Sequence, residues 1–361
     1  MKAAVFTAPH QPLTIQEVQI DRPMPREVVV KTVASGVCHS DLHYVDGFYT
    51  MPTPAVLGHE AAGIVEDIGS QVTYVKPGDH VILCLSVFCG SCEKCLTGHP
   101  NLCRRRPMRG KNEPSRLRFN DGTPVNQFAL LSTYAEKMLV HENSMVKIPE
   151  SFPLDLAALI GCGVTTGVGA ALNTAKVTPG STVAVFGAGC VGLSAIQGAR
   201  IAGARKIIAV DIGEYKLSTA RQFGATDIVD ASKGDPVEQI KAMTDGGVDF
   251  SFEAIGLKKT GEQSVFCLGP GGVATIIGMI PQGQKLELPA TGLAPEYKVQ
   301  GSSMGSNRFR VDMLHYIDFY HQGRLKLDEM ITRRIRLEDV NAAFTAMKNR
   351  EVARSVIMFS P

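Results

Sequence analysis

The sequence of 361 residues lacks a net charge that would attract a charged partner. It holds 37 lysine and arginine residues against 35 aspartate and glutamate residues, a formal net charge of +2. Nucleic acids and anionic membrane surfaces attract strongly basic proteins. The charge balance therefore gives no reason to expect either of them as a partner.

Long apolar runs, internal repeats and low-complexity segments are also missing. The N-terminus has no uninterrupted apolar core of signal-peptide length, and no stretch approaches 18 apolar residues without charge, glycine or proline. These absences predict a cytoplasmic protein without membrane spans. Apolar residues make up 44% of the chain, which is ordinary for globular proteins, and the length predicts two or three domains.

The pattern of short elements changes near residue 151. Before it, proline and glycine separate β-rich runs at 28–33, 63–68 and 80–83. After it, apolar runs alternate with helical stretches, and this alternation predicts βαβ units and a parallel sheet covered by helices on both faces. These apolar runs lie at 182–186, 206–210, 227–229, 248–252 and 273–278. Two helical periods, at 312–322 and 337–348, then precede a terminal strand at 354–359.

A glycine motif directly follows the run at 182–186. It reads Gly187-Ala188-Gly189-Cys190-Val191-Gly192 and leads into a helix-compatible stretch. Alone, such a motif can mean only a tight turn, but its place between strand and helix is the context that dinucleotide binding requires. There the first glycine permits the turn, the second lets the backbone approach a pyrophosphate, and the third lets helix and strand pack closely. The start of the helix then offers free N–H groups to the phosphates.

Asp211 predicts which dinucleotide binds. It closes the next apolar run, 19 residues after Gly192. A carboxylate there accepts hydrogen bonds from both ribose hydroxyls of NAD and repels the 2′-phosphate of NADP. A strand-end aspartate can also serve only as a helix cap, but the glycines in register favour NAD.

Four of the nine cysteines, Cys89, Cys92, Cys95 and Cys103, lie within fifteen residues. Four thiolates at such spacing can close a tetrahedral structural zinc site with no open position. Free reactive thiols are one alternative, although four so close together would be prone to oxidation. An iron–sulfur cluster is the chemical rival, because sulfur ligands suit both metals. Clustered cysteines in a chain without a secretory signal favour a metal site.

A second candidate metal site is dispersed along the chain, at Cys38, His59 and Cys162. Taken alone, each is better explained as a buried structural residue. Beside a cofactor fold, two cysteines and one histidine are a known ligand set for alcohol oxidation, because a catalytic zinc needs three protein ligands and one vacant position. Asp41 and Glu60 are then predicted to lie just outside the ligands, one orienting the His59 ring and the other close to the metal.

Together these motifs resemble those of the zinc-dependent medium-chain alcohol dehydrogenase family over nearly the whole chain. The resemblance rests on the four cysteines and on residues 58–60, 161–192, 245–249 and 354–356. The segment between Cys103 and Ser132 is similar to the animal-type branch, which includes liver-type and glutathione-dependent formaldehyde dehydrogenases. The resemblance implies two zinc ions per subunit, NAD, and a homo-oligomer. The long segment after Cys103 favours a homodimer, and a tetramer, which also occurs in the family, is the alternative.

The fold implied by the resemblance is α/β with two domains. A GroES-like, β-rich catalytic domain would be built from residues 1–163 and 304–361. A Rossmann domain with a doubly wound parallel sheet would comprise residues 164–303 and bind the cofactor. The active site would lie in the cleft between them.

Roles in the site are carried over by position. Cys38, His59 and Cys162 match the catalytic zinc ligands, and the four clustered cysteines match the structural ones. Ser40 matches the hydroxyl that hydrogen-bonds the substrate oxygen, and His43 the end of its proton relay. The implied cofactor contacts are Asp211 and Lys216 at the adenosine ribose, and His39 and Arg354 beside the pyrophosphate. The implied lining of the substrate channel is Tyr49, Leu85, Phe128, Ala129 and Met279.

Departures from the family's usual residues bear on the substrate. Leu85 replaces an aromatic that commonly narrows the pocket, and Ser40 is smaller than the alternative threonine, so a wide apolar channel is expected. This predicts primary aromatic, allylic or medium-chain alcohols, and their aldehydes, as substrates. S-hydroxymethylglutathione or another thiol conjugate is the alternative, but Gly47 and Tyr49 stand where formaldehyde dehydrogenases carry an acidic pair. His39 replaces an arginine of many relatives, and we expect a weaker grip on the phosphates.

Two functions of other kinds stay open on the sequence. A reductase of activated double bonds could share the fold, but it would not need Cys38, His59 and Cys162. A nucleic-acid binder could use a basic segment, although without interleaved aromatics such a patch is usually a solvated loop. The basic residues of this segment are Arg104, Arg105, Arg106, Arg109, Lys111, Arg116 and Arg118.

Overall fold

The computed structural model describes residues 1–110, 112–349, 351 and 353–359, so Lys111 of the basic segment lies outside the described residues. The chain divides into two compact units. The first comprises Met1–Cys162, Arg308–Asp318 and Leu327–Pro361, and the second comprises Gly163–Asn307 and Phe319–Lys326. The resemblance led us to expect all of 304–361 in the first domain, whereas 304–307 and 319–326 group here with the second unit.

Among the described residues, the first unit contains two β-sheets. One has six strands in the order β2-β1-β5-β9-β8-β3, and the other has seven, in the order β11-β7-β6-β4-β19-β18 with β10 also paired to β4. The longest strand, β4 (Glu27–Gly36), is rich in valine, whose branched side chain favours an extended backbone. The remaining strands are β1 (Lys2–Phe6), β2 (Thr14–Glu17), β3 (Gln19–Ile20), β5 (Ala55–Val56), β6 (Ala61–Ile68), β7 (His80–Leu83), β8 (Leu117–Arg118), β9 (Pro124–Gln127), β10 (Lys137–His141), β11 (Met145–Lys147), β18 (Arg333–Ile335) and β19 (Ser355–Met358).

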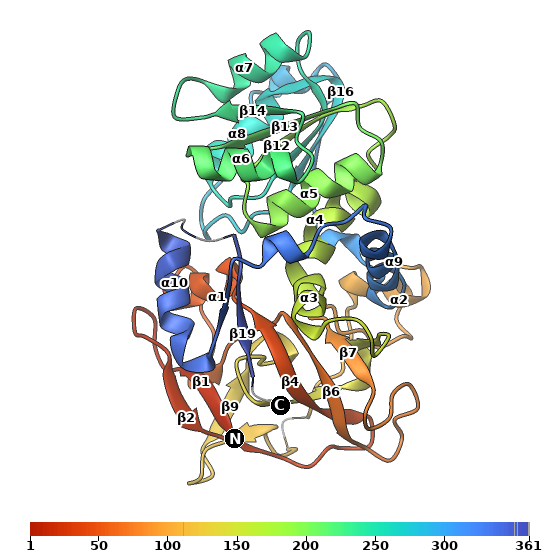
Figure 1. Cartoon of the computed structure of the whole chain (residues 1–361), viewed down its shortest axis with the longest axis vertical. Helices are drawn as coiled ribbons and strands as arrows, with labels where there is room; N and C mark the ends of the chain where they lie inside the picture. Colours follow the sequence, from red (N-terminus) through yellow and green to blue (C-terminus); the bar gives the residue numbers. More distant parts are fainter. Residues whose placement is uncertain (111, 350, 352, 360–361) are drawn as a thin grey trace. The chain divides into compact units, whose positions relative to one another are not determined.

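The C-terminal segment returns to the first unit. Strand β19 pairs antiparallel with the end of β4, where Val356 lies opposite Gly36, and parallel with β18. In Figure 1 the dark blue β19 accordingly lies beside the red β4. This pairing brings Arg354 next to the segment that follows β4 and carries Cys38. The helices of this unit are α1 (His39–Val45), α2 (Glu93–Leu96), α3 (Leu154–Leu159), α10 (Val340–Lys348) and most of α9 (Phe309–His321).

The described part of the second unit forms a six-stranded sheet in which every neighbouring pair is parallel, in the order β14-β13-β12-β15-β16-β17. This confirms the parallel sheet expected from the sequence. Its strands are β12 (Thr182–Phe186), β13 (Lys206–Asp211), β14 (Asp227–Asp230), β15 (Val248–Glu253), β16 (Leu268–Ile276) and β17 (Lys298–Gly301). Its helices include α4 (Thr165–Gly169), α5 (Cys190–Ile201), α6 (Glu214–Gln222), α7 (Pro236–Met243) and α8 (Lys258–Phe266).

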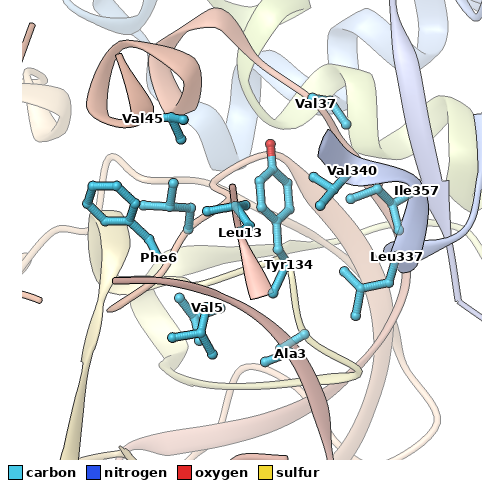
Figure 2. Packing of buried hydrophobic residues seen from close by; sticks show 14 of the residues in the cluster. Ala3, Val5, Phe6, Leu13, Val37, Val45, Tyr134, Leu337, Val340 and Ile357 are labelled. Atoms are coloured by element: carbon cyan, nitrogen blue, oxygen red, sulfur yellow. The ribbon is translucent and has the colours of Figure 1, made fainter. Parts of the chain in front are cut away.

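Each unit has its own apolar core. In the first, residues of β1 and α10 pack around Tyr134, as Figure 2 shows. In the second, the strands of the parallel sheet supply most of the core, with Phe186 and Val248 among its fully buried members. The described residues include one helical run, Leu154–Ala175, that is long and apolar enough to cross a membrane. Its most apolar window is 89% buried inside the structure, as is usual for a core helix.

Candidate metal centres and cofactor site

Cys38 and Asp41 are placed by the turn from β4 into α1. Cys38 has an extended backbone at the N-cap of the helix, and Asp41 lies in its first turn. A carboxylate is favoured there by the positive end of the helix dipole. Both side chains point into the first unit, since Cys38 and Asp41 are buried.

His59 and Cys162 reach the same place through two glycines. Gly58 has a φ of +89°, and a Cβ on it would lie 2.4 Å from the hydroxyl oxygen of Thr133, so only glycine fits before His59. Cys162 lies in a π-helical turn (Ile160–Val164) after α3, a feature often found at functional sites. A Cβ on Gly161 would lie 2.8 Å from the carbonyl oxygen of Leu83.

The three predicted ligands come together. The sulfurs of Cys38 and Cys162 and a ring nitrogen of His59 lie within 4.8 Å of one another, and all three residues are buried. A hydrogen bond from Cys162 lowers the pKa of Cys38 well below its usual value, and the same contact raises the pKa of Cys162. Cys162 thus keeps its proton while Cys38 is ionised, and a cation between the two sulfurs would favour the loss of the second proton. The donor set fits a zinc ion with one position left open.

Asp41 fixes the orientation of the His59 ring. Its Oδ1 lies 3.1 Å from Nδ1 of His59 and accepts the N–H of Gly58 at 2.9 Å. Its Oδ2 accepts the hydroxyl of Tyr134 at 2.9 Å. With Nδ1 donating to Asp41, Nε2 is the nitrogen left to bind a metal. The sequence predicted an orienting role for Asp41 or Glu60, but it gave no sign that Tyr134 differs from an ordinary core aromatic.

Glu60 is buried and paired with Arg354. Its Oε2 accepts a hydrogen bond from Arg354 at 2.8 Å, and the same guanidinium donates to the carbonyl of Val37 at 2.6 Å. Its Oε1 is buried without a hydrogen-bond partner among the described residues. Burial raises the pKa of Glu60 to about 7, although the charge of Arg354 opposes this. A buried oxygen without a partner calls for a nearby ion or water. The predicted contact of Arg354 with a pyrophosphate stays a prediction.

Helix α1 also carries the residues of the predicted relay. The hydroxyl oxygen of Ser40 lies 3.7 Å from the sulfur of Cys38, beside the ligand set. His43 is half-buried, and this burial lowers its pKa, so its ring is neutral near pH 7 and can accept a proton. His39 is exposed, with its ring centre 6.4 Å from that of His43.

Of the predicted channel residues, Phe128 lies directly against the ligand set. Its ring meets the His59 ring edge-on, with the centres 5.6 Å apart. The next residue, Ala129, has a positive φ of 53°, so the chain turns sharply there. The other channel residues are Tyr49, with its ring 6.0 Å from His43, Leu85, which packs on the cluster around Val81 and Leu83, and Met279, which belongs to the second unit. Their places in a channel stay predictions.

The four clustered cysteines also come together. Their sulfurs all lie within 4.8 Å of one another, and three pairs are 3.5, 3.9 and 3.9 Å apart. Four sulfurs about 2.3 Å from one zinc in a tetrahedron are separated by about 3.8 Å. A cluster of several iron atoms needs more room between its ligands, so the spacing fits a single ion. The N–H groups of Ser91 and Cys92 lower the pKa of Cys89 to about 6, while burial raises that of Cys95 to about 12.

Much of the basic segment is neutralised within the first unit. Arg109 donates to both oxygens of Glu27, at 2.6 to 3.2 Å, and to Asp21 at 2.7 Å. Arg116 donates to Glu27 at 2.7 Å and Arg118 to Asp21 at 3.4 Å. A cleft of about 200 Å³ beside this network is lined by Glu27, Arg109 and Arg116 together with apolar residues such as Met24 and Met108. Of the described basic positions, only residues 104–106 are exposed, so the charge that an anionic partner could meet is confined to these three arginines.

The glycine motif forms the turn between β12 and α5 that the sequence predicted. Gly187 has a φ of +102°, and a Cβ on Gly192 would lie 1.7 Å from the carbonyl oxygen of Gly187. Around Gly189 the space is open, with no atom within 4 Å of an added Cβ. Helix α5 begins at Cys190, which is buried, and continues through the half-buried Val191. The turn therefore leaves the start of a twelve-residue helix accessible to a phosphate.

Asp211 ends β13 beside this turn and braces it. Its Oδ2 accepts the N–H of Ala188 at 2.6 Å, and its Oδ1 accepts the N–H of Ile212 at 2.7 Å. The ammonium group of Lys216 lies 3.9 Å from Oδ2. The carboxylate is thus fixed next to the glycine motif, where the ribose of a dinucleotide would meet it.

Glu253, which the sequence analysis did not single out, has a similar place at the end of β15. Its Oε1 accepts the N–H groups of Ile255 and Gly256, at 2.9 and 2.8 Å, and the hydroxyl of Thr260 at 2.8 Å. The loop that it holds lies beside Gly187, because a Cβ on that glycine would lie 2.8 Å from the Ile255 side chain. A charged residue closing an apolar strand is the signal that could have found it.

Comparisons with known proteins agree with this geometry. Residues 24–150 match the family model of the alcohol dehydrogenase GroES-like domain, and residues 190–318 match that of the zinc-binding dehydrogenases. A similar structure is an alcohol dehydrogenase zinc-binding domain protein from Burkholderia ambifaria, 35% identical over 100% of this chain and 99% of that one, with a TM-score of 0.95. Benzyl alcohol dehydrogenase from Acinetobacter calcoaceticus is 35% identical over 99% of both chains, with a TM-score of 0.92. A zinc-binding dehydrogenase from Sinorhizobium meliloti bound to NADP is 29% identical over 99% of both chains, with a TM-score of 0.84.

Proposed function

This chain belongs to the zinc-dependent alcohol dehydrogenase family, and we propose that it transfers a hydride between a primary alcohol and NAD, reversibly giving the aldehyde. The observation that carries the proposal is the buried set of Cys38, His59 and Cys162, with Asp41 on the His59 ring. A double-bond reductase would not need this set. We also propose a cytoplasmic homo-oligomer with a catalytic domain of 1–163 and 304–361 and a cofactor domain of 164–303.

Two zinc ions per subunit are part of the proposal. Cys38, His59 and Cys162 would hold one and leave a position open for substrate, while the four clustered cysteines would close the other site. When bound in the open site, zinc supplies Lewis acidity that lowers the pKa of an alcohol hydroxyl. The observed sulfur spacing and the buried oxygen of Glu60 support both assignments.

The residues of α1 would orient the alcohol and remove its proton. Ser40 lies beside Cys38 and would accept the substrate's hydroxyl proton while its own proton moves towards His43. His43 is suited to receive a proton, because burial lowers its pKa and keeps the ring neutral near pH 7. Asp41 would keep the His59 ring in one orientation throughout.

NAD is proposed as the hydride acceptor because Asp211 stands beside the glycine turn. Its carboxylate would accept the ribose hydroxyls and repel the extra phosphate of NADP, while Lys216 lies next to it. The Sinorhizobium meliloti structure holds NADP, so family membership alone does not select NAD, and we propose that Asp211 does. The nicotinamide supplies the redox chemistry, and the protein supplies position and charge.

Primary aromatic, allylic or medium-chain alcohols are the proposed substrates. The Phe128 ring lies edge-on against His59, and the Tyr44 ring also packs on Phe128 at a centre-to-centre distance of 4.9 Å. A relative is named as a benzyl alcohol dehydrogenase. A benzyl group buries on the order of 100 Å² more apolar area than ethanol does, worth roughly 2–3 kcal/mol at about 25 cal/mol per Å². This predicts a catalytic efficiency about 30- to 150-fold higher for benzyl alcohol than for ethanol.

The deciding experiment compares kcat/KM for benzyl alcohol, hexanol, ethanol and S-hydroxymethylglutathione with NAD. The pairing of Arg109, Arg116 and Arg118 with acidic residues counts against the glutathione adduct, because these groups have no free charge to offer it. Ethanol matching benzyl alcohol, or the adduct exceeding all three alcohols, would contradict the proposed substrate. Failure to oxidise any alcohol would contradict the proposed function.

A further inference from the structure

Tyr134 carries a hydroxyl into an otherwise apolar cluster. Its side chain is 0% exposed and packs with residues of β1 and α10, among them Val5 and Val340. In Figure 2 its hydroxyl is the only oxygen among the labelled side chains. Phenylalanine would fill the same volume without a polar group, and a buried hydroxyl is costly unless it is hydrogen-bonded. The hydroxyl therefore needs an explanation beyond packing.

That explanation is its contact with Asp41. The hydroxyl donates to Oδ2 of Asp41 at 2.9 Å, while the other oxygen of the same carboxylate holds His59 and the N–H of Gly58. The carboxylate is thus held at both oxygens. Rotation about its Cβ–Cγ bond would break contacts at either end.

The backbone holds Tyr134 in this position. The N–H of Thr133 donates to the carbonyl of Gly58, and the N–H of Tyr134 to that of Leu57, both at 3.1 Å. The carbonyl of Tyr134 accepts the N–H of Ala4 at 2.8 Å. The loop that delivers His59 and the segment that delivers the hydroxyl are therefore tied together. The backbone of Tyr134 cannot move away without breaking these bonds, and the buried cluster packs around its ring.

We propose that Tyr134 is a positioning residue of the candidate catalytic zinc site, which acts through Asp41 on the direction of His59. This inference deepens the proposed function and rests on it. Without the hydroxyl, the Asp41 carboxylate is held only at Oδ1, so its rotation is less restricted and Nε2 of His59 points less steadily at the metal. Loss of an outer partner of a metal-bound histidine typically costs about 10- to 100-fold in metal affinity or activity. Tyr134 acts one residue further out, so we expect an effect of about tenfold.

The test is Tyr134→Phe in the full chain, which removes only the hydroxyl. Zinc per subunit and the dissociation constant of each zinc are measured by competition with a chromogenic chelator, and thermal unfolding is followed on the same samples. We expect one zinc to bind about tenfold more weakly while the other is unchanged. With Co²⁺ in place of zinc, the visible bands, which report ligand geometry, should shift in the variant.

A matched control is Val340→Ala, which trims the same cluster without touching Asp41. It should lower Tm but leave both zinc affinities within about twofold of wild type. In an Asp41→Asn background, adding Tyr134→Phe should change zinc affinity by less than about twofold. The carboxylate through which Tyr134 acts on His59 is already absent in that background.

Three results would overturn the inference. These are a zinc affinity of Tyr134→Phe equal to that of wild type, an equal weakening by Val340→Ala, or a full tenfold effect of Tyr134→Phe in the Asp41→Asn background. A wild-type protein that holds no zinc at Cys38, His59 and Cys162 would instead refute the proposed function itself. The two failures are therefore distinguishable.

Discussion

Replacing Arg109 with glutamine should destabilise the protein without changing its choice of substrate. Arg109 donates to both oxygens of Glu27 and to Asp21, and its side chain is only 8% exposed. Glutamine has no charge and cannot reach both carboxylates with one planar group. Two carboxylates would lose their shared cation inside the first unit.

The loss in the free energy of unfolding depends on which groups still compensate the charges of Asp21 and Glu27 in Arg109→Gln. Removing one partner of a buried ion pair costs about 3–5 kcal/mol, because a charge is left uncompensated. Here Glu27 keeps Arg116 at 2.7 Å, and Asp21 is 22% exposed, so we expect the lower end, about 3 kcal/mol. For a domain of roughly 200 residues, 1 kcal/mol shifts Tm by about 2–4 °C. The Tm of the first unit should therefore fall by about 6–12 °C.

The loss should also depend on pH in a defined direction. Burial opposes the charged forms of Asp21 and Glu27, but the hydrogen bonds from Arg109 outweigh it, so both pKa values lie below their usual range in the folded protein. A depressed carboxyl pKa adds stability above the unfolded-state pKa, near 4, and this stability is lost as pH falls through the folded-state value. The difference between wild type and Arg109→Gln should therefore be constant above about pH 5 and shrink below about pH 4.

Urea and thermal unfolding at several pH values measure this difference. Arg105→Gln makes the same charge change at an exposed position and should stay within about 0.5 kcal/mol of wild type. Both variants should keep the wild-type ratio of kcat/KM for benzyl alcohol over S-hydroxymethylglutathione. Unchanged stability of Arg109→Gln, or a loss confined to the glutathione adduct, would refute the structural role of Arg109 and favour a ligand-binding one.

Cys162→Ser should leave one zinc ion per subunit and no activity, whereas Cys103→Ser should leave one zinc ion and lower the Tm. Cys267 lies outside both sulfur sets, so the control variant Cys267→Ser should keep two zinc ions. Two zinc ions in either ligand variant would refute these assignments. Asp211→Gly should weaken NAD binding and reduce the preference over NADP, measured by titration of both dinucleotides, and a wild type that binds them equally would show that Asp211 does not select. His43→Gln should slow oxidation by about 10²–10⁴-fold near pH 7 and recover partly at high pH, where hydroxide accepts the proton. An unchanged pH–rate profile would exclude His43 from the relay.

The second unit was largely predictable from sequence because its signals are local. Buried parallel strands are continuous apolar runs, and β12 and β13 lie within one residue of the predicted bounds. The glycine turn is dictated by short-range sterics, since no side chain fits at Gly192. Strand β17, by contrast, is short and largely exposed, so its sequence carries no apolar pattern and it was missed.

The contacts that complete the first unit were not predictable from local pattern. The pairing of β19 with β4 joins opposite ends of the chain, and neither strand encodes its partner. The arginines of the basic segment indicated a solvated loop because their acidic partners, Asp21 and Glu27, lie more than 80 residues earlier in the sequence. The set of Cys38, His59 and Cys162 was proposed because such residues stand beside a cofactor fold, and the family resemblance then matched the three positions. No spacing between three such distant residues indicates by itself that they meet.

Three buried acids share one function in this fold, although the sequence analysis singled out only Asp41 and Asp211. Asp41, Asp211 and Glu253 each accept backbone N–H groups of a loop beside a candidate ligand site. Such bonds offset the cost of burying a carboxylate and at the same time fix the loop. Asp211 and Glu253 both close an apolar strand and precede a glycine with positive φ, Gly213 and Gly256. An acid that ends an apolar run shortly before a glycine therefore indicates a braced ligand loop, and Glu253 meets that criterion as fully as Asp211 does.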